Sequence, residues 1–393
     1  MAKERTKNQT VLVAICENSR FTKTKAKKMK RKGNLFEKII HKQNIHKAIL
    51  NARKGKTKRP SIKKVDENLT EEINKIHNAL KNKTYVIAKY ETETRMERGK
   101  LRKLYKLPYN PDRIIQHAII QVIEPVLSKT FITDTYQSIK GRGCHKAKKK
   151  IIRMLKSNKE TKYILKIDVE KYYPNINNKI LKNMLRKKIK CKPTLELLDL
   201  LIDSVKGLAI GNYISQILGN FYLSYFDHFV KEKLKVKNYV RYADDMVFML
   251  DSKAKLAEIK RTIDYYFKHK LKIKIKRNWQ IFPFISRGLD FLGFRFFKNF
   301  TILRKSIKKS YLKTVKKIIK KKPILSMINS LMSYYGWIKA TNSYNLLTST
   351  FTSVLKEKID IIVKTFGISN PILKINTHRK RKNRLRYYQP TLF

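Results

Sequence analysis

Apolar and polar positions alternate most clearly in the central third of the chain. Residues 163–168 form a short apolar run that ends in an acid, and residues 239–250 hold two β-forming apolar runs separated by Ala243, Asp244 and Asp245, which predicts a buried hairpin. Apolar spacings of three and four residues predict helices between these segments, over 178–190, 194–205 and 214–230. Helices and strands mixed in this way predict an α+β fold.

The N-terminal half is mainly helical in pattern. Apolar residues recur at helical spacing over 35–49 and 69–80, and residues 113–131 have the pattern of a buried helix that runs into a turn. Between them, residues 84–90 are expected to be extended and lead into a basic stretch at 95–107.

After the hairpin, residues 252–268 place apolar side chains on one helical face, and residues 272–276 alternate Lys and Ile with the period of a strand. Beyond residue 300 the chain turns to Lys-rich helical patterns, which indicate a separate helical domain. Residues 1–33 and 377–393 are basic and read as an arm and a basic, aromatic tail that become ordered on binding nucleic acid.

Charge narrows the choice of partner. The chain of 393 residues has 92 Lys and Arg against 29 Asp and Glu, a formal charge of +63, and such self-repulsion calls for a polyanion such as nucleic acid. A basic structural protein is the plainer alternative, but 42% hydrophobic residues with 21 Tyr and 18 Phe can fill a sizeable core. Three cysteines without a Cys-x-x-Cys pair indicate neither a disulfide framework nor a zinc site. With no apolar run of about 18 residues, we expect a cytoplasmic protein without a membrane partner.

Three acids are candidates for catalysis. Asp244 and Asp245 are adjacent in an apolar setting, so their mutual repulsion requires a cation, for which Mg²⁺ is the expected ion. A central sheet can bring Asp168 to them, and two ions about 3.5–4 Å apart would then support an in-line phosphoryl transfer. Consecutive strand residues face opposite sides, so the turn must reorient one of the paired acids for both to share the ions. Taken alone, Asp168 would more simply cap the following turn.

These motifs together resemble reverse transcriptases of the group II intron-like bacterial lineage. Tyr242-Ala243-Asp244-Asp245 is similar to their signature, and Asp168 with Tyr172-Tyr173 is similar to their first catalytic motif. The segments 113–118, 124–127, 133–147 and 288–294 follow in the order of the family's fingers motifs and primer grip. The resemblance implies a right-hand polymerase with an antiparallel palm sheet packed on helices: fingers with the start of the palm over 34–160, palm over 161–300 and an α-helical thumb over 301–376.

The resemblance also assigns roles to individual residues. It implies an RNA-directed DNA polymerase that uses two Mg²⁺ ions, with Mn²⁺ as a substitute, held by the catalytic Asp168, Asp244 and Asp245 with Val169. Its substrate residues would include a steric gate that excludes the ribose 2′-hydroxyl, Tyr173. The remaining substrate contacts would come from Lys100, Arg102, Glu170, Gln216 and Lys276, and the primer grip from Phe291, Leu292 and Gly293. The abundance of Lys and Arg leaves open that Arg102 belongs only to a solvated basic stretch.

One segment narrows the lineage. Ile210-Gly211-Asn212-Tyr213-Ile214-Ser215-Gln216 is similar to diversity-generating retroelement enzymes, in which this segment is linked to error-prone copying; the alternative is that Gln216 caps the next helix. Antiphage-defence reverse transcriptases, which work with a noncoding RNA, share much of this pattern and remain an alternative. A nonenzymatic RNA-binding or maturase-like protein is an alternative of another class. The expected partners are an RNA template, a cDNA or primer strand and dNTPs, with room for an accessory protein.

Overall fold

The structure is a computed structural model that describes residues 31–97, 99–156, 161–320 and 324–366. The described chain divides into two compact units, one ending at Phe284 and the other beginning at Ile285. None of the described helices combines the length and the apolar character that crossing a membrane requires. The arm and the tail expected at the two ends lie outside the described residues. The division into fingers, palm and thumb at residues 160 and 300 stays a prediction.

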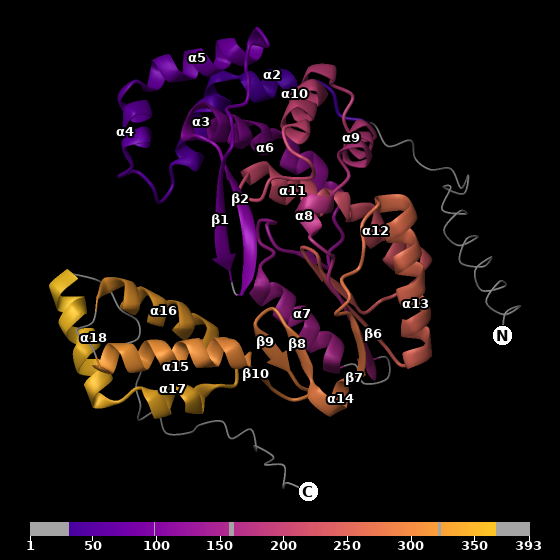
Figure 1. The fold of residues 1–393 in the computed structure, drawn as a ribbon, viewed down its shortest axis with the longest axis vertical. Helices are drawn as coiled ribbons and strands as arrows, with labels where there is room; N and C mark the ends of the chain where they lie inside the picture. The colour runs from indigo at the N-terminus through magenta and orange to yellow at the C-terminus, as the bar shows by residue number, and fades with distance from the viewer. Residues whose placement is uncertain (1–30, 98, 157–160, 321–323, 367–393) are drawn as a thin grey trace, which may run out of the picture. The chain divides into compact units, whose positions relative to one another are not determined.

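Helices dominate the N-terminal part of the first unit (Figure 1). The short α2 (Phe36–Ile40) ends at His41, whose imidazole accepts a hydrogen bond from the Gln43 N–H and so caps α3 (Lys42–Ala52). Next come α4 (Pro60–Glu67), α5 (Leu69–Lys81) and, after a π-helical turn at Tyr109–Arg113, α6 (Ile114–Leu127), which ends in a 3₁₀ turn at Ser128–Thr130. α6 packs against α3 and α11. The helices expected over 69–80 and 113–131 are therefore confirmed.

A β-hairpin projects from this part of the unit, where the sequence predicted only a basic stretch. Strands β1 (Glu91–Glu97) and β2 (Lys100–Lys106) pair antiparallel over seven residues each. The sequence conceals the hairpin because most of it is polar and exposed and even its apolar Met96 and Leu101 face solvent, so no alternation marks it. Its base is held where the Tyr105 N–H donates to the Ile210 carbonyl at 2.8 Å.

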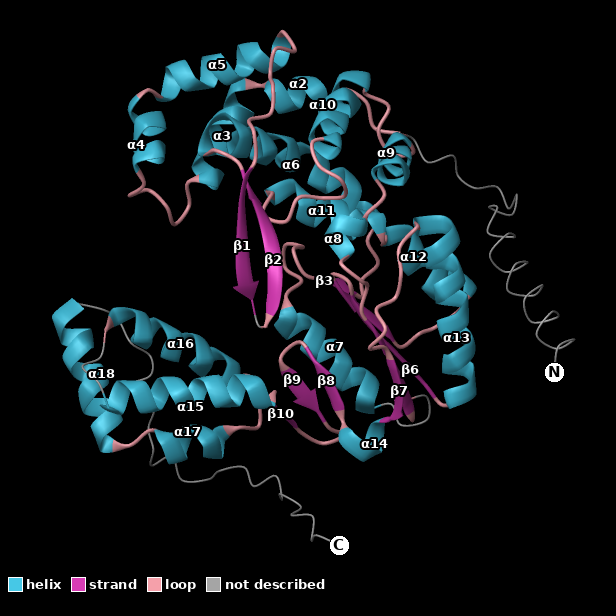
Figure 2. Cartoon of the chain, viewed as in Figure 1, coloured by secondary structure: helices cyan, strands magenta, loops and turns pink. Residues whose placement is uncertain are grey.

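The first unit contains a five-stranded sheet in the order β3-β5-β6-β4-β7; strands β3, β6 and β7 are labelled in Figure 2. Its strands are β3 (Thr135–Tyr136), β4 (Tyr163–Ile167), β5 (Tyr239–Tyr242), β6 (Asp245–Leu250) and β7 (Gln280–Pro283). All neighbours pair antiparallel except β3 with β5. The predicted strand at 163–168 and the predicted hairpin at 239–250 are both present.

The segment 272–276 corrects the expected topology, because it is not a strand of this sheet. It contributes one isolated bridge, between Val169 and Ile275, and β7 takes the edge beside β4 instead. Lys272 ends the preceding helix in the left-handed region, at φ 54°. The segment that follows makes its backbone hydrogen bonds beyond the end of β4, with Asp168 and Glu170.

Helices cover the sheet and extend its core. α13 (Lys253–Tyr266) packs on β4, β6 and β7, and α7 (Cys144–Lys156) packs on β3 and β5. The others are α8 (Tyr172–Asn175), α9 (Asn178–Arg186), α10 (Lys192–Asp203), α11 (Tyr213–Tyr222) and α12 (Ser224–His228), with π-helical turns at Phe229–Lys233 and Phe267–Leu271. One hydrophobic core joins the N-terminal helices to the sheet, so the site rests on a continuous packed body.

The second unit has its own sheet and its own core. After α14 (Phe284–Arg287), which spans the division, strands β8 (Leu289–Phe291), β9 (Phe294–Phe296) and β10 (Thr301–Leu303) form an antiparallel sheet in the order β10-β9-β8. Helices α15 (Lys305–Lys320), α16 (Leu325–Lys339), α17 (Tyr344–Thr350) and α18 (Ser353–Phe366) follow. Their apolar faces form a separate core around Tyr311, Ile318 and Leu355, which confirms Lys-rich helices beyond residue 300.

Candidate active site

The β5–β6 hairpin and the end of β4 bring the predicted catalytic acids together. In the antiparallel pairing of β4 with β6, Ile167 is opposite Met246, so Asp168 and Asp245 each lie one residue beyond this pair. Tyr242 pairs with Asp245, which leaves Ala243 and Asp244 as a two-residue turn. Ala243 has φ 55°, the left-handed conformation that such turns favour. The turn therefore removes Asp244 from the alternation of the strand. This is the reorientation that the paired acids need if both are to face one site.

The carboxyl groups of Asp244 and Asp168 interact directly. Burial, the charge and a hydrogen bond of Asp168, and the charge of Asp245 raise the pKa of Asp244 to about 7, against a smaller opposing effect of its own backbone N–H. Two carboxyl groups in contact, of which Asp244 is largely buried and Asp168 partly so, favour one shared proton or a cation between them. This is the electrostatic condition of a cation site.

The segment 274–276 braces the other side of Asp168. The Lys276 N–H donates to the Asp168 carbonyl at 2.8 Å, and its ammonium lies 3.6 Å from Asp168 Oδ2. The Lys276 side chain thus lies beside Asp168. The Glu170 N–H donates to the Lys274 carbonyl at 3.0 Å, so any contact between that amide and a triphosphate would require this bond to break.

Val169 lies between the two backbone bonds that Asp168 and Glu170 make with the 274–276 segment. Because successive carbonyls of an extended chain point to opposite edges, the Val169 carbonyl faces away from that segment. Carboxylates and a backbone carbonyl are ligands that Mg²⁺ accepts. Among the described residues, however, no three His, Cys, Asp or Glu side chains gather into a set that could hold a metal. The chain thus supplies two carboxylates in contact and a carbonyl. This set fits an ion whose remaining ligands are water molecules and substrate phosphates.

Tyr173 lies next to these acids on α8. Burial raises the pKa of its phenol to about 12, with a further contribution from the charge of Asp244. Two glycines allow the chain to pass close by. A Cβ on Gly219 of α11 would lie 3.1 Å from the Tyr173 ring, and a Cβ on Gly207, at φ 76°, would lie 2.5 Å from the Pro174 carbonyl oxygen. Tyr173 is therefore held by close backbone packing.

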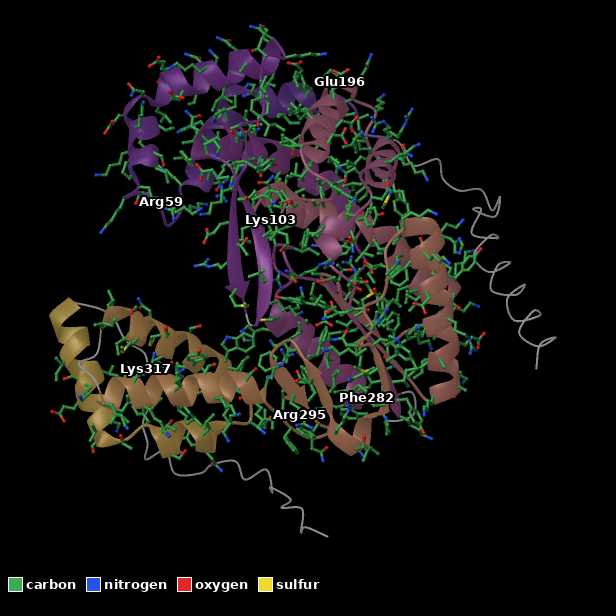
Figure 3. The ribbon with its side chains drawn as sticks, viewed as in Figure 1. Arg59, Lys103, Glu196, Phe282, Arg295 and Lys317 are labelled. Atoms are coloured by element: carbon green, nitrogen blue, oxygen red, sulfur yellow. The ribbon has the colours of Figure 1, made fainter. Side chains whose placement is uncertain are left out.

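Arg102 and Lys100 come from β2 of the fingers-side hairpin. Arg102 lies opposite Arg95, and its charge reaches the Tyr173 phenol, where it opposes the upward shift of the pKa. Lys100 is the exposed first residue of the strand. Lys103, whose side chain is labelled in Figure 3, lies over the Tyr105 ring at 5.5 Å. Of the two predicted cations, Arg102 is the one whose electrostatic effect reaches Tyr173.

Gln216 lies in the first turn of α11, and its side chain is exposed. The residues around it anchor the segment: the Ser215 hydroxyl donates to the Ala209 carbonyl at 2.7 Å, and the Tyr213 N–H donates to Gln116 Oε1 at 3.0 Å. The same helix carries Gly219 against Tyr173. Gln216 is therefore an exposed polar group on a firmly held helix that also packs against Tyr173.

The predicted primer grip lies in the second unit. Leu292 and Gly293, at φ 55° and 82°, form the two-residue turn between β8 and β9, and Phe291 pairs with Phe294. A Cβ on Gly293 would lie 2.8 Å from Ile307 Cδ1 and 2.9 Å from Trp337 Cζ3. The turn is therefore packed against the helices of its own unit.

One face of α15 in that unit is strongly cationic. A surface hollow of about 400 Å³ is lined by Lys309, Leu312, Lys313, Lys316, Lys317 and Lys320; Lys317 is labelled in Figure 3. Lysines on a continuous helical face make a sequence-independent contact for phosphates.

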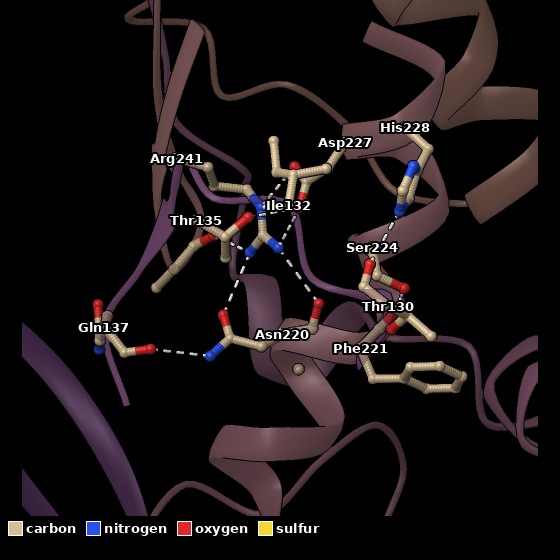
Figure 4. Close-up of polar contacts among 12 residues, drawn as sticks. Thr130, Ile132, Thr135, Gln137, Asn220, Phe221, Ser224, Asp227, His228 and Arg241 are labelled. Carbon is tan, nitrogen blue, oxygen red and sulfur yellow. Dashed lines mark hydrogen bonds and ion pairs between the residues drawn. The ribbon is translucent and has the colours of Figure 1, made fainter. Parts of the chain in front are cut away.

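The sequence did not reveal a buried ion pair behind the hairpin. Arg241 of β5 and Asp227 of α12 are both fully buried and form a salt bridge at 2.5 Å, surrounded by Thr135 and Asn220 (Figure 4). The available signal was a single charge in each of two apolar segments, Tyr239 to Tyr242 and Phe226 to Val230. Buried charges need partners, so each of these two charges predicted an oppositely charged partner. The pattern did not specify that Arg241 and Asp227 pair with each other.

Comparisons with known proteins identify the family to which this architecture and its acidic turn belong. The sequence model of the reverse transcriptase (RNA-dependent DNA polymerase) family matches residues 80–296, which is more than half of the 393 residues. The chain belongs to the reverse transcriptase family. Its α+β fold is that of a right-hand polymerase, as predicted.

Individual relatives are distant. Protein YkfC of Escherichia coli (strain K12) is 24% identical over 246 residues, which cover 51% of this chain and 64% of that protein. Among solved structures, apo telomerase from Candida tropicalis has a TM-score of 0.46 at 14% identity, over 72% of this chain and 58% of that one. Telomerase from Candida albicans, in complex with a fragment of telomeric RNA, has a TM-score of 0.46 at 12% identity, over 74% and 63%. The chain spans less than two thirds of the length of each.

Proposed function

We propose that the chain copies an RNA template into DNA, adding dNTPs to a primer at the Asp168–Asp244 site. The observation that carries the proposal is the contact between these two carboxyl groups, in a chain of the reverse transcriptase family. Two bound Mg²⁺ ions, or Mn²⁺ in their place, would activate the primer 3′-hydroxyl and stabilise the leaving pyrophosphate.

The residues of the chain have distinct tasks in this reaction. Asp168, Asp244 and the Val169 carbonyl would hold the ions, with Asp245 contributing charge beside them. The cation of Arg102 would bind the incoming triphosphate, and the partly buried Tyr173 ring would exclude a ribose 2′-hydroxyl. The Lys276 ammonium, 3.6 Å from Asp168 Oδ2, would give a proton to the pyrophosphate. Phe291, Leu292 and Gly293 would position the primer end.

A primed RNA template tests the activity. With labelled dNTPs and Mg²⁺, we expect Asp244→Ala to abolish incorporation while RNA affinity stays near that of the wild type, because cationic surfaces supply the binding. Asp251→Ala is a matched control, since Asp251 directly follows the same hairpin and is exposed in its pairing with Lys255. A wild-type chain that binds RNA but incorporates no dNTP would instead support the nonenzymatic RNA-binding role.

We propose further that the biological role is mutagenic copying in a diversity-generating retroelement. Exposed Gln216 supports this role, because its amide can hydrogen-bond near the nascent base pair whereas Pro offers no such group. Gln216→Pro should change the errors made opposite template adenines, and Tyr213→Phe on the same helix should not. An unchanged error spectrum would favour the antiphage-defence role. Sequencing of the RNA that copurifies with the chain would identify its template and any noncoding RNA partner.

A further inference from the structure

The buried pair of Arg241 and Asp227 is more elaborate than a single ion pair. The Arg241 Nε donates to both carboxylate oxygens of Asp227 at 2.8 and 3.0 Å, and its Nη2 donates to Oδ2 at 2.5 Å. The Tyr239 hydroxyl and the Thr135 hydroxyl also donate to Asp227, at 2.7 and 2.9 Å. Four elements, β3, β5, α11 and α12, meet at this network (Figure 4).

Stability alone does not account for such a pair. Removing two charges from water costs free energy that their attraction rarely exceeds, and a well-packed apolar pair of the same volume is often as stable or more so. A fully buried pair with every oxygen engaged is better explained by the geometry that it fixes. The question is therefore which atoms the guanidinium holds in place besides Asp227.

The guanidinium reaches the turn of the catalytic hairpin. Arg241 Nη1 donates to the carbonyl of Ala243 at 2.8 Å, and the Ala243 N–H donates to the Tyr136 carbonyl at 3.3 Å. Both backbone groups of Ala243 are thus engaged, and its φ is 55°. A residue other than glycine keeps such a conformation only where its surroundings hold it there. Asp244 is the next residue along the chain.

The same guanidinium also fixes the helix behind the gate. Nη1 donates to Asn220 Oδ1 and Nη2 donates to the Asn220 carbonyl, each at 3.2 Å, and the Asn220 amide donates to the Gln137 carbonyl at 2.9 Å. Asn220 follows Gly219, the residue that packs closely on the Tyr173 ring. One side chain therefore links the acidic turn to the helix that supports Tyr173.

We propose that Arg241 is a positioning residue, which, anchored on Asp227, holds the Ala243 carbonyl and so fixes Asp244 relative to Asp168 and Tyr173. The inference rests on the proposed polymerase function and extends it to residues that touch neither nucleotide nor ion. Loss of the guanidinium should lower the rate of the chemical step, because small displacements of a catalytic group have large effects. Binding of the nucleotide should change little.

Two pairs of substitutions in the full chain separate positioning from stability. Arg241→Met with Asp227→Leu replaces the ion pair by apolar side chains and leaves no buried charge alone. The control, Thr135→Val with Tyr239→Phe, removes two hydrogen bonds to Asp227 but keeps the bond from Arg241 to Ala243. For each we would measure Tm, kcat and KM for a dNTP on a primed RNA, and the Mg²⁺ concentration that gives half-maximal rate.

Both double variants should lose Tm, because each leaves buried polar groups without their partners. In the apolar pair kcat should also fall by about 10- to 100-fold, while the dNTP KM stays within about twofold and more Mg²⁺ is needed. The control should keep its kcat. A kcat for the apolar pair that equals the kcat of the control would overturn the proposal.

If the apolar pair fails to fold, Arg241→Lys provides the same test. A lysine keeps the charge opposite Asp227 but lacks the fork that serves Asp227 and Ala243 together, so a low kcat is again expected and an unchanged kcat again rejects the role. A wild-type chain without any incorporation would reject the proposed function instead. In that case the rise in Tm on adding Mn²⁺ measures how well the turn holds the acids for ion binding. This rise should be smaller in the Arg241 variants than in the control. An equal rise in both would reject the positioning role.

Discussion

Asp244→Asn should make the chain more stable in the absence of divalent ions, although it removes a carboxyl that the proposed reaction needs. The wild-type carboxyl is buried and in contact with Asp168, and its pKa rises from 3.8 to about 7. Asparagine has nearly the same shape and carries no charge at any pH, so it relieves the repulsion and the cost of burying the charge. The perturbation tests the electrostatics of the site directly.

The pKa shift sets both the size and the pH dependence of the effect. A folded-state pKa above the unfolded value means that the folded chain resists ionisation, so the wild type loses stability as pH rises from 3.8 toward 7. The shift is about 3 units, which corresponds to a ceiling of about 4 kcal/mol above pH 7. The advantage of the Asn variant should be largest near pH 8 and shrink steadily toward pH 5.

Chemical denaturation with EDTA present, at constant ionic strength and at several pH values, measures this difference. Asp251→Asn is the control, because Asp251 is exposed and pairs with Lys255 at 3.3 Å, and exposed pairs contribute at most about 1 kcal/mol. Adding Mg²⁺ should then stabilise the wild type more than the Asn variant, since an ion that binds only the folded state raises its stability.

An Asn variant no more stable than the wild type at pH 8 would refute the reasoning. The same holds for a gain that is equal at pH 5 and pH 8, because the effect would then come from packing and not from charge. Either result would mean that Asp244 and Asp168 do not repel one another in the folded chain.

Three further results are expected. Tyr173→Ala should admit rNTPs while Tyr173→Phe should not, because the ring and not the hydroxyl forms the barrier; incorporation of rNTPs by neither variant would remove Tyr173 from the gate role. Gly207→Ala should destabilise the chain by about 2 kcal/mol or more, while Gly55→Ala, at a similar φ but with nothing within 4 Å, should cost about 1 kcal/mol; equal losses by denaturation would contradict the close approach to Pro174. RNA affinity should fall steeply with salt, and replacing two lysines of the α15 face by Gln should reduce the slope of log Kd against log salt by about 2; an unchanged slope would show that this face does not contact RNA.

Much of the site was predictable because its acids lie at the ends of strongly patterned elements. The apolar run before Asp168 and the two runs around Asp244 each specify a buried strand, and buried strands that share a sheet bring their ends together. The helical pattern of 113–131 was equally clear, since a helix buried on most sides keeps apolar residues throughout. Local sequence was sufficient wherever one face or one strand had to be buried.

The remaining features depend on contacts between distant segments. The β1–β2 hairpin is exposed on most of its surface, so no burial pattern marks it in the sequence. The strand period at 272–276 was misleading because β7 forms the edge of the sheet instead. Arg241 and Asp227 find each other only once α12 packs behind β5. Each of these features depends on which surfaces of the chain pack together. The spacing of residues along one segment does not specify this packing.

The choice of alanine at position 243 has a consequence for how the site is readied. Glycine would adopt φ 55° without steric conflict, but it would also increase the conformational entropy that the turn loses on folding. Alanine restricts that freedom, and its two backbone bonds select the left-handed shape from what remains. In the proposed reaction Asp244 is therefore held in position before a nucleotide binds. Little of the binding free energy of the nucleotide is then needed to order the turn.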